Sequence, residues 1–120
     1  MHEASIVTEL LRIASDECSK NGYTKIDSIK VIVGRATGVM TDALLFAFNV
    51  LKEDTLAKEA NLIIEEIPVR GVCKDCGKEF ESNENYLIFE CPSCGSFSVN
   101  IISGKELNIT EMEVSQWKLN

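Results

Sequence analysis

The stretch that decides the fold begins with Cys73-Lys-Asp-Cys76-Gly77 and ends with Cys91-Pro-Ser-Cys94-Gly95. Each end is a Cys-x-x-Cys-Gly motif, in which two thiolates converge on one ion and the glycine permits a tight turn close to the sulfur atoms. The spacer, residues 77–90, is slightly shorter than the ~15–20 residues usual between paired motifs of this kind. Four sulfur donors without a histidine indicate a closed tetrahedral zinc site with a structural role, because no coordination position stays open.

The four cysteines also have two metal-free alternatives, namely two disulfides or four free thiols. The start of the chain, Met1-His-Glu-Ala-Ser, lacks the basic residues and apolar stretch of an export signal. We therefore expect a cytoplasmic protein, and the reducing cytoplasm disfavours disulfides. Bound metal is the interpretation that we favour for this stretch.

Length and charge exclude several classes of function. A chain of 120 residues, 45% of them hydrophobic, forms one modest core, or one core with a small satellite. The net charge of −7 and the scattered lysines and arginines argue against a nucleic-acid partner. No apolar run is long enough to cross a bilayer, so we expect no membrane partner. The sequence offers no paired catalytic carboxylates, no nucleophile beside a base and no phosphate-binding loop, so we expect no enzyme.

Hydrophobic periodicity predicts the elements around the two motifs. Ahead of them it predicts a helix over residues 4–21, a strand over 25–34, a second helix capped by Thr41 and a strand over 60–69. The second helix is expected to bury its leucine and phenylalanine face, which consists of Leu44, Leu45, Phe48 and Leu51. Cys18 lies on the apolar stripe of the first helix, so it is expected to be a buried small hydrophobic residue. Trp117 fits either a packed cap or an exposed contact.

Residues 69–72 are expected to be a crossing into the metal-binding module, with strands over 97–102 and 107–114 beyond the second motif. About thirty residues are too few for a self-sufficient core, so the module depends on its metal. The last strand is expected to return to the first sheet. The resulting division is an α/β domain over residues 1–70 and 103–120 and a zinc-binding domain over 71–102.

The first three residues include the only histidine of the chain. In Met1-His2-Glu3, the α-amine, the deprotonated amide nitrogen of His2 and its imidazole Nδ1 close two chelate rings around one metal ion. Planar nitrogen donors suit Ni(II) or Cu(II), and Glu3 adds a carboxylate or its amide nitrogen. The plainer alternative is a frayed terminus leading into a helix, with Glu3 favourable near the positive helix end. The motif alone does not decide between them.

Met1-His2-Glu3 at the start of a short acidic chain, the two cysteine motifs and the segment from Gly34 to Phe48 together resemble the HypA/HybF family. These proteins are nickel metallochaperones of nickel–iron hydrogenase maturation, and the resemblance covers nearly the whole chain. It implies an α+β fold, in which the domain over residues 1–70 and 103–120 binds nickel. That domain is a mixed three-stranded sheet with two helices, plus an inserted small zinc-ribbon-like four-cysteine domain. It also implies that His2 is the essential Ni(II) ligand, with the Met1 amine and Glu3 beside it, and that Cys73, Cys76, Cys91 and Cys94 hold Zn(II).

The same resemblance implies the partners. They are a maturation GTPase of the HypB type, the hydrogenase large subunit and, in members that also serve urease, a urease accessory protein; a monomer and a homodimer both stay open. Some members have extra histidines beside the zinc motifs, whereas Gly77 and Gly95 stand there in this chain. A fourth nickel donor therefore has to come from Glu3, from water or from an acidic residue such as Asp42.

Two other classes of protein use paired Cys-x-x-Cys motifs. A rubredoxin-like electron carrier binds iron there, but the short spacer and the two preceding helices argue against it. A zinc-ribbon interaction module that binds nucleic acid is disfavoured by the acidic charge. Both stay as alternatives that the sequence does not eliminate.

Overall fold

The computed structural model describes residues 2–83 and 89–118. The chain divides into two compact units, which we number in chain order. Unit 1 comprises Met1–Val31, Met40–Ile64 and Ile109–Asn120, and unit 2 comprises Ile32–Val39 and Glu65–Asn108. The four cysteines of the two motifs belong to unit 2 and the N-terminal residues to unit 1. The functional division into a nickel domain and a zinc domain over residues 71–102 stays a prediction.

Helix α1 spans Glu3–Lys20, within one residue of the predicted bounds. Its buried positions recur every three or four residues, as one face of a helix requires, and they are Val7, Leu10, Leu11, Ala14 and Cys18. Cys18 is only 1% exposed, and burial raises the pKa of its thiol above the ordinary value. The predicted role of Cys18 as a small core residue is therefore confirmed.

Helix α2 spans Thr41–Leu51 and buries Leu44 and Phe48. Two of the four positions predicted to be buried are not, because Leu45 is 40% and Leu51 39% exposed. Leu45 lies about 100° around the helix from Leu44, and Leu51 is the last helical residue. The prediction that Thr41 caps the helix is also wrong, since the N-cap is Met40 and its side chain makes no capping hydrogen bond.

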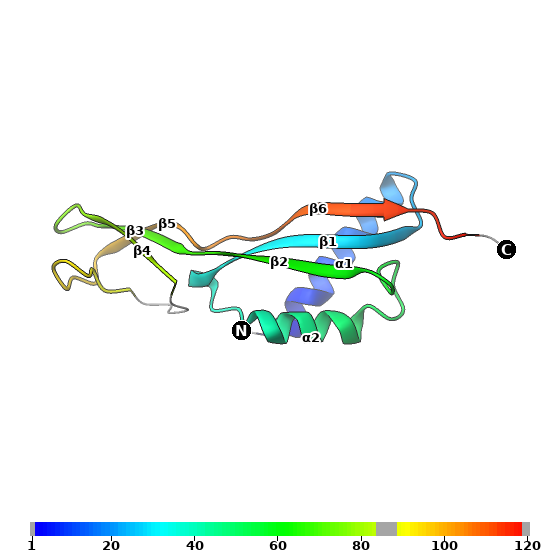
Figure 1. Cartoon of the computed structure of the whole chain (residues 1–120), viewed down its shortest axis with the longest axis horizontal. Coiled ribbons are helices and arrows are strands. Elements are labelled where there is room, and N and C mark those ends of the chain that lie inside the picture. Colours follow the sequence, from blue (N-terminus) through cyan, green and yellow to red (C-terminus); the bar gives the residue numbers. More distant parts are fainter. Residues whose placement is uncertain (1, 84–88, 119–120) are drawn as a thin grey trace. The chain divides into compact units, whose positions relative to one another are not determined.

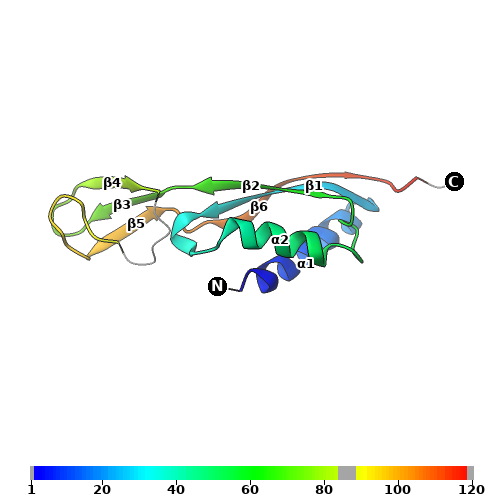
Figure 2. The same ribbon diagram turned by 60° about the horizontal axis from the view of Figure 1, so that its bottom comes forward.

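The first sheet has three strands in the order β2-β1-β6. Their bounds are Lys25–Gly34 for β1, Asn61–Ile67 for β2 and Leu107–Ser115 for β6. Strands β1 and β2 run in the same direction and β6 runs in the opposite one (Figure 1), as expected when a helix connects the first two. Both helices lie on one face of this sheet (Figure 2). The predicted mixed three-stranded sheet with two helices, including the return of the last strand, is confirmed.

The second sheet also has three strands, in the order β4-β3-β5. Their bounds are Val69–Cys73 for β3, Glu79–Ser82 for β4 and Val99–Ser103 for β5. The central strand β3 pairs antiparallel with both neighbours. The interpretation of residues 69–72 as a mere crossing is therefore wrong, and β4 lies in the spacer between the two cysteine motifs, where the sequence predicts no strand. The first cysteine motif forms the turn between β3 and β4.

None of the described helices has both the length and the hydropathy needed to span a membrane.

Candidate metal sites

The four predicted zinc ligands lie together at one end of the second sheet. All four sulfur atoms lie within 4.8 Å of one another, with Sγ–Sγ distances of 3.5 Å from Cys73 to Cys94 and 3.6 Å from Cys76 to Cys91. A disulfide requires a distance of about 2.05 Å, so none of the four is cross-linked. Tetrahedral zinc with Zn–S bonds of about 2.3 Å places its sulfur ligands about 3.8 Å apart. The donor set and its spacing therefore fit a four-thiolate zinc site.

Each cysteine motif closes in the same way. The N–H of Gly77 donates to the carbonyl oxygen of Cys73, and that of Gly95 donates to the carbonyl oxygen of Cys91, both at 2.9 Å. The two glycines have φ angles of 76° and 78°, a conformation that costs other residues free energy. A further backbone N–H within each motif donates to the first sulfur, at 3.5 and 3.4 Å. The glycine that follows each motif is thus required by the turn that gathers the thiols.

These N–H groups favour the thiolate form that metal binding needs. The backbone N–H of Cys94 is the main cause that lowers the pKa of Cys91 to about 6, and the N–H of Cys76 lowers the pKa of Cys73. The N–H of Ser96 acts in the same sense on Cys94, but the Cys73 thiol, burial and the other two thiols outweigh it and raise the pKa of Cys94 to about 12. Adjacent thiolates repel one another, and a divalent cation removes that repulsion.

Hydrogen bonds also join the two cysteine motifs, in addition to any metal that they share. The hydroxyl of Ser96, behind the second motif, donates to the carboxylate of Asp75 in the first. The N–H of Lys74 donates to the carbonyl oxygen of Ser98 at 2.8 Å. These residues were not identified from the sequence, because polar residues beside cysteines follow no pattern that predicts a hydrogen bond between the motifs.

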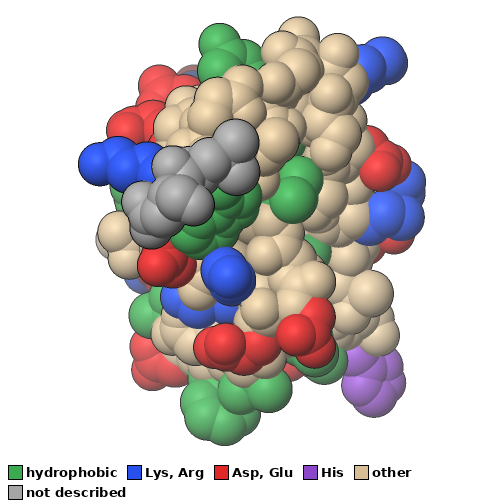
Figure 3. Space-filling model, turned by 90° about the vertical axis from the view of Figure 1, so that its right-hand side faces the viewer, with side chains coloured by type: hydrophobic (Ala, Val, Ile, Leu, Met, Phe, Trp, Pro, Cys, Tyr) green, Lys and Arg blue, Asp and Glu red, His purple; other side chains and the backbone are tan. Residues whose placement is uncertain are grey.

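The N-terminal residues begin helix α1. His2 is its N-cap, in an extended backbone conformation and without a side-chain capping hydrogen bond; its carbonyl oxygen accepts the N–H groups of Ser5 and Ile6 at 3.1 and 3.3 Å. The histidine side chain lies on the surface, in purple in Figure 3. Met1 lies outside the described residues, so the set Met1, His2 and Glu3 stays a prediction.

The carboxylate of Glu3 has a partner that the sequence analysis missed. Its Oε2 accepts the backbone N–H of Met40 at 3.1 Å, and this bond is the main cause that lowers the pKa of Glu3. Asp42, named as a candidate extra donor, lies in the first turn of α2, directly after this point. Glu3 and Met40 are 37 positions apart in sequence, and no local motif indicates that they form a hydrogen bond.

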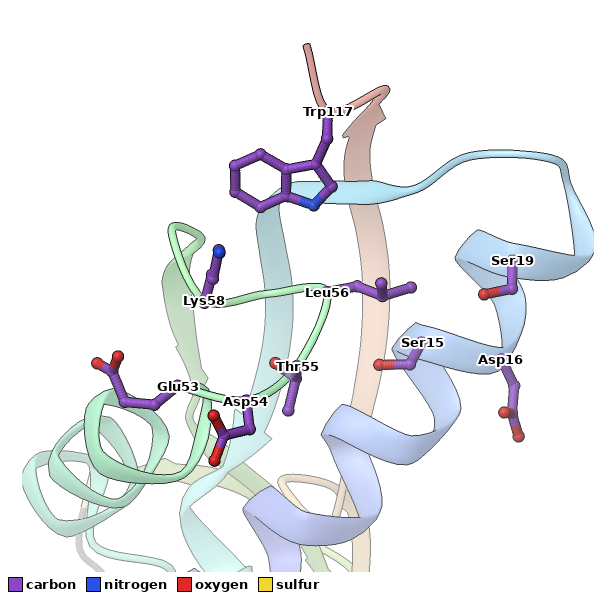
Figure 4. A pocket seen from close by; sticks show the side chains of 9 residues that line it. All are labelled: Ser15, Asp16, Ser19, Glu53, Asp54, Thr55, Leu56, Lys58 and Trp117. Atoms are coloured by element: carbon purple, nitrogen blue, oxygen red, sulfur yellow. The ribbon is translucent and has the colours of Figure 1, made fainter. Parts of the chain in front are cut away.

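A cleft of about 670 Å³ lies between the end of α1, the segment after α2 and Trp117. The carboxylates of Asp16, Glu53 and Asp54 do not converge in it (Figure 4), and among the described residues only the four cysteines form a group suited to a metal ion. The ring of Trp117 has the ammonium groups of Lys25 and Lys58 at 4.6 and 4.7 Å from its centroid. Trp117 is therefore a half-buried packed cap over the start of β1.

Comparison with known proteins gives one consistent result. The family model described as "Hydrogenase/urease nickel incorporation, metallochaperone, hypA" matches residues 1–114. The hydrogenase maturation factor HypA of a Picosynechococcus strain is 40% identical over 114 residues, which cover 95% of this chain and 99% of the relative. That of Moorella thermoacetica is 42% identical over 109 residues, covering 91% and 95%.

A solved structure agrees with these relatives. The solution structure of the Ni metallochaperone HypA from Helicobacter pylori matches with a TM-score of 0.68 and 30% identity, covering 98% of this chain and 100% of that one. The matches span both units, which sets aside the rubredoxin-like and zinc-ribbon alternatives. The matched family consists of metallochaperones, which confirms the prediction that the chain is not an enzyme. The chain belongs to the HypA family of hydrogenase and urease nickel-incorporation metallochaperones.

Proposed function

We propose that the chain binds Ni(II) at its N-terminus and delivers it during maturation of nickel–iron hydrogenase. The donors are the Met1 amine, the deprotonated amide nitrogen and Nδ1 of His2, and the carboxylate or amide nitrogen of Glu3. The planar nitrogen set suits Ni(II) and does not suit Mg(II). The proposal requires that Met1 is retained and that its α-amine is free. Nickel is the cargo, and its binding has to be reversible.

The observation that supports this proposal best is the state of His2. It is exposed and precedes the first helical residue, and its imidazole is not used to cap α1. The helix start is stabilised instead by the carbonyl oxygen of His2. A metal ion therefore reaches the imidazole without displacing a side-chain contact that the helix needs.

The four-cysteine site has the second role, that of structural zinc. Four sulfur ligands fill the tetrahedral coordination of the ion and leave no position for substrate. We propose a zinc domain over residues 71–102 and a nickel domain over residues 1–70 and 103–120. With so few residues in the zinc domain, the ion supplies much of the free energy of folding.

A maturation factor acts together with other maturation factors. We propose a HypB-type GTPase and the hydrogenase large subunit as partners in the cytoplasm. Because the matched family model names urease as well as hydrogenase, a urease accessory protein is the partner proposed for a urease pathway. Both a monomer and a homodimer are compatible with this role.

Substitution of His2 by Ala tests the proposal directly. It removes the imidazole and leaves an amine–amide pair, so we expect loss of the planar nickel absorption spectrum in a titration of untagged protein. Zinc content by elemental analysis and the helical circular dichroism signal should stay at the native level. Hydrogenase maturation in cells should fail with this folded variant; unchanged nickel affinity would rule out the N-terminal site.

A further inference from the structure

Helix α2 takes its N-terminal cap from a different helix. Its N-cap residue, Met40, has only a thioether sulfur, a weak acceptor, and makes no side-chain capping hydrogen bond. In a capping box, a glutamate or glutamine three residues into the helix accepts the N–H of the N-cap residue. That position is occupied here by Ala43. The carboxylate Oε2 of Glu3, on α1, accepts the Met40 N–H instead, at 3.1 Å.

The same carboxylate also belongs to the start of α1, since Glu3 is the first residue of that helix. A negative charge near the N-terminus of a helix is favourable, and Glu3 stands at the N-termini of two helices at once. The residue before it, His2, is fixed by two backbone hydrogen bonds to its carbonyl oxygen. The peptide between His2 and Glu3 is therefore restrained from both sides.

We propose that Glu3 is a positioning residue for nickel: its carboxylate links the N-terminus of α1 to Met40 of α2 and so restrains His2, and it does not bind the ion. This Glu3–Met40 link rests on the proposed N-terminal nickel site and leaves Glu3 only its amide nitrogen as a donor. A chain end that is already ordered at residue 3 loses less conformational entropy when it closes around an ion. The consequence is tighter nickel binding without an additional ligand.

Three substitutions distinguish a link from a ligand. Glu3→Gln keeps an oxygen that accepts the Met40 N–H, whereas Glu3→Ala removes it. Met40→Pro removes the N–H itself and leaves Glu3 intact; the φ of −86° at Met40 has to change by only about 10–20° to suit proline. Met40→Ala is the matched control, because it removes the exposed side chain but keeps the N–H.

Nickel ion is titrated into the untagged, zinc-loaded full chain. We expect Glu3→Gln and Met40→Ala to bind within about twofold of the native protein, and Glu3→Ala and Met40→Pro each to lose about fivefold in affinity, the size of a lost helix cap. The double variant Glu3→Ala/Met40→Pro should lose no more nickel affinity than either single variant, because both substitutions remove the same hydrogen bond. In the zinc-loaded protein without nickel, the amide hydrogen of residue 40 should exchange faster in Glu3→Ala than in Glu3→Gln.

A carboxylate ligand would give the opposite pattern. Glu3→Gln would then fall to the level of Glu3→Ala while Met40→Pro bound nickel like the native chain, and the proposed link would be overturned. If Met40→Pro does not fold, the two Glu3 variants decide alone. Native nickel affinity in His2→Ala would instead contradict the N-terminal nickel site, and the exchange rates at residue 40 would still report on the link.

Discussion

Gly34, the last residue of β1, occupies a position with no room for a side chain. A Cβ atom there would lie 2.0 Å from the carbonyl oxygen of Gly104 and 2.6 Å from the nitrogen of Lys105, both backbone atoms that cannot turn aside. Gly22, after α1, has the opposite property: its φ is +83°, and nothing lies within 4 Å of a Cβ built on it. One glycine is required by space and the other by backbone conformation.

Alanine substitutions separate these two requirements. Gly34→Ala should lower the free energy of unfolding by about 3 kcal/mol, because the backbone has to move to admit a methyl group. Gly22→Ala should cost only about 1 kcal/mol, the price of a left-handed conformation for a residue with a side chain. Urea unfolding followed by circular dichroism measures both. Equal losses, or a larger one for Gly22→Ala, would contradict the close packing at Gly34.

At the scale of elements, the zinc site and the second sheet depend on each other. The first cysteine motif is the turn between β3 and β4, and Cys73 pairs with Val99 of β5. Three short strands of four or five residues bury little apolar surface, so the metal has to supply the missing stability.

Cys91→Ser should therefore release zinc and unfold the second sheet, while α1 and α2 keep most of the helical signal. Serine offers a neutral hydroxyl in place of a thiolate, and a site with three thiolates binds zinc more weakly. Ser93→Ala is the control within the same motif, because the side chain of Ser93 is exposed and only its N–H contacts Cys91. Elemental analysis and far-ultraviolet circular dichroism give the result; full zinc occupancy in Cys91→Ser would refute the assignment.

Elements with long hydrophobic patterns were predictable from the sequence. The helix predicted over residues 4–21 and the strand predicted over 25–34 are present as α1 and β1. Their buried positions follow the helical and the alternating period, the latter at Ile29, Val31 and Val33. Strand β4 has the sequence Glu-Phe-Glu-Ser and therefore only one apolar residue. The turn at the first cysteine motif brings it beside β3, so no hydrophobic pattern in the sequence predicts this strand. The cysteine cluster was predictable because spacing defines it, whereas the Glu3–Met40 contact joins residues that no local rule relates.

At the scale of the molecule, the two metal sites use different donor atoms, sulfur in one and nitrogen in the one proposed at the N-terminus. Four thiolates in unit 2 form a closed site suited to an ion that stays. The nitrogen donors proposed at the N-terminus belong to unit 1, where His2 is exposed and an ion can leave. Structural metal and cargo metal therefore need not compete for the same ligands.

Nickel binding through the free N-terminus can be tested by extending the chain ahead of Met1. Extra residues turn the α-amine into an amide and remove one donor, but they leave His2, Glu3 and all four cysteines unchanged. Nickel titrations of native and extended protein, read by absorption and accompanied by zinc analysis, make the comparison. We expect the extended protein to lose the planar nickel spectrum and to keep its zinc. An extended protein that binds nickel with native affinity and the same spectrum would contradict the account and direct the search for nickel to the thiolates.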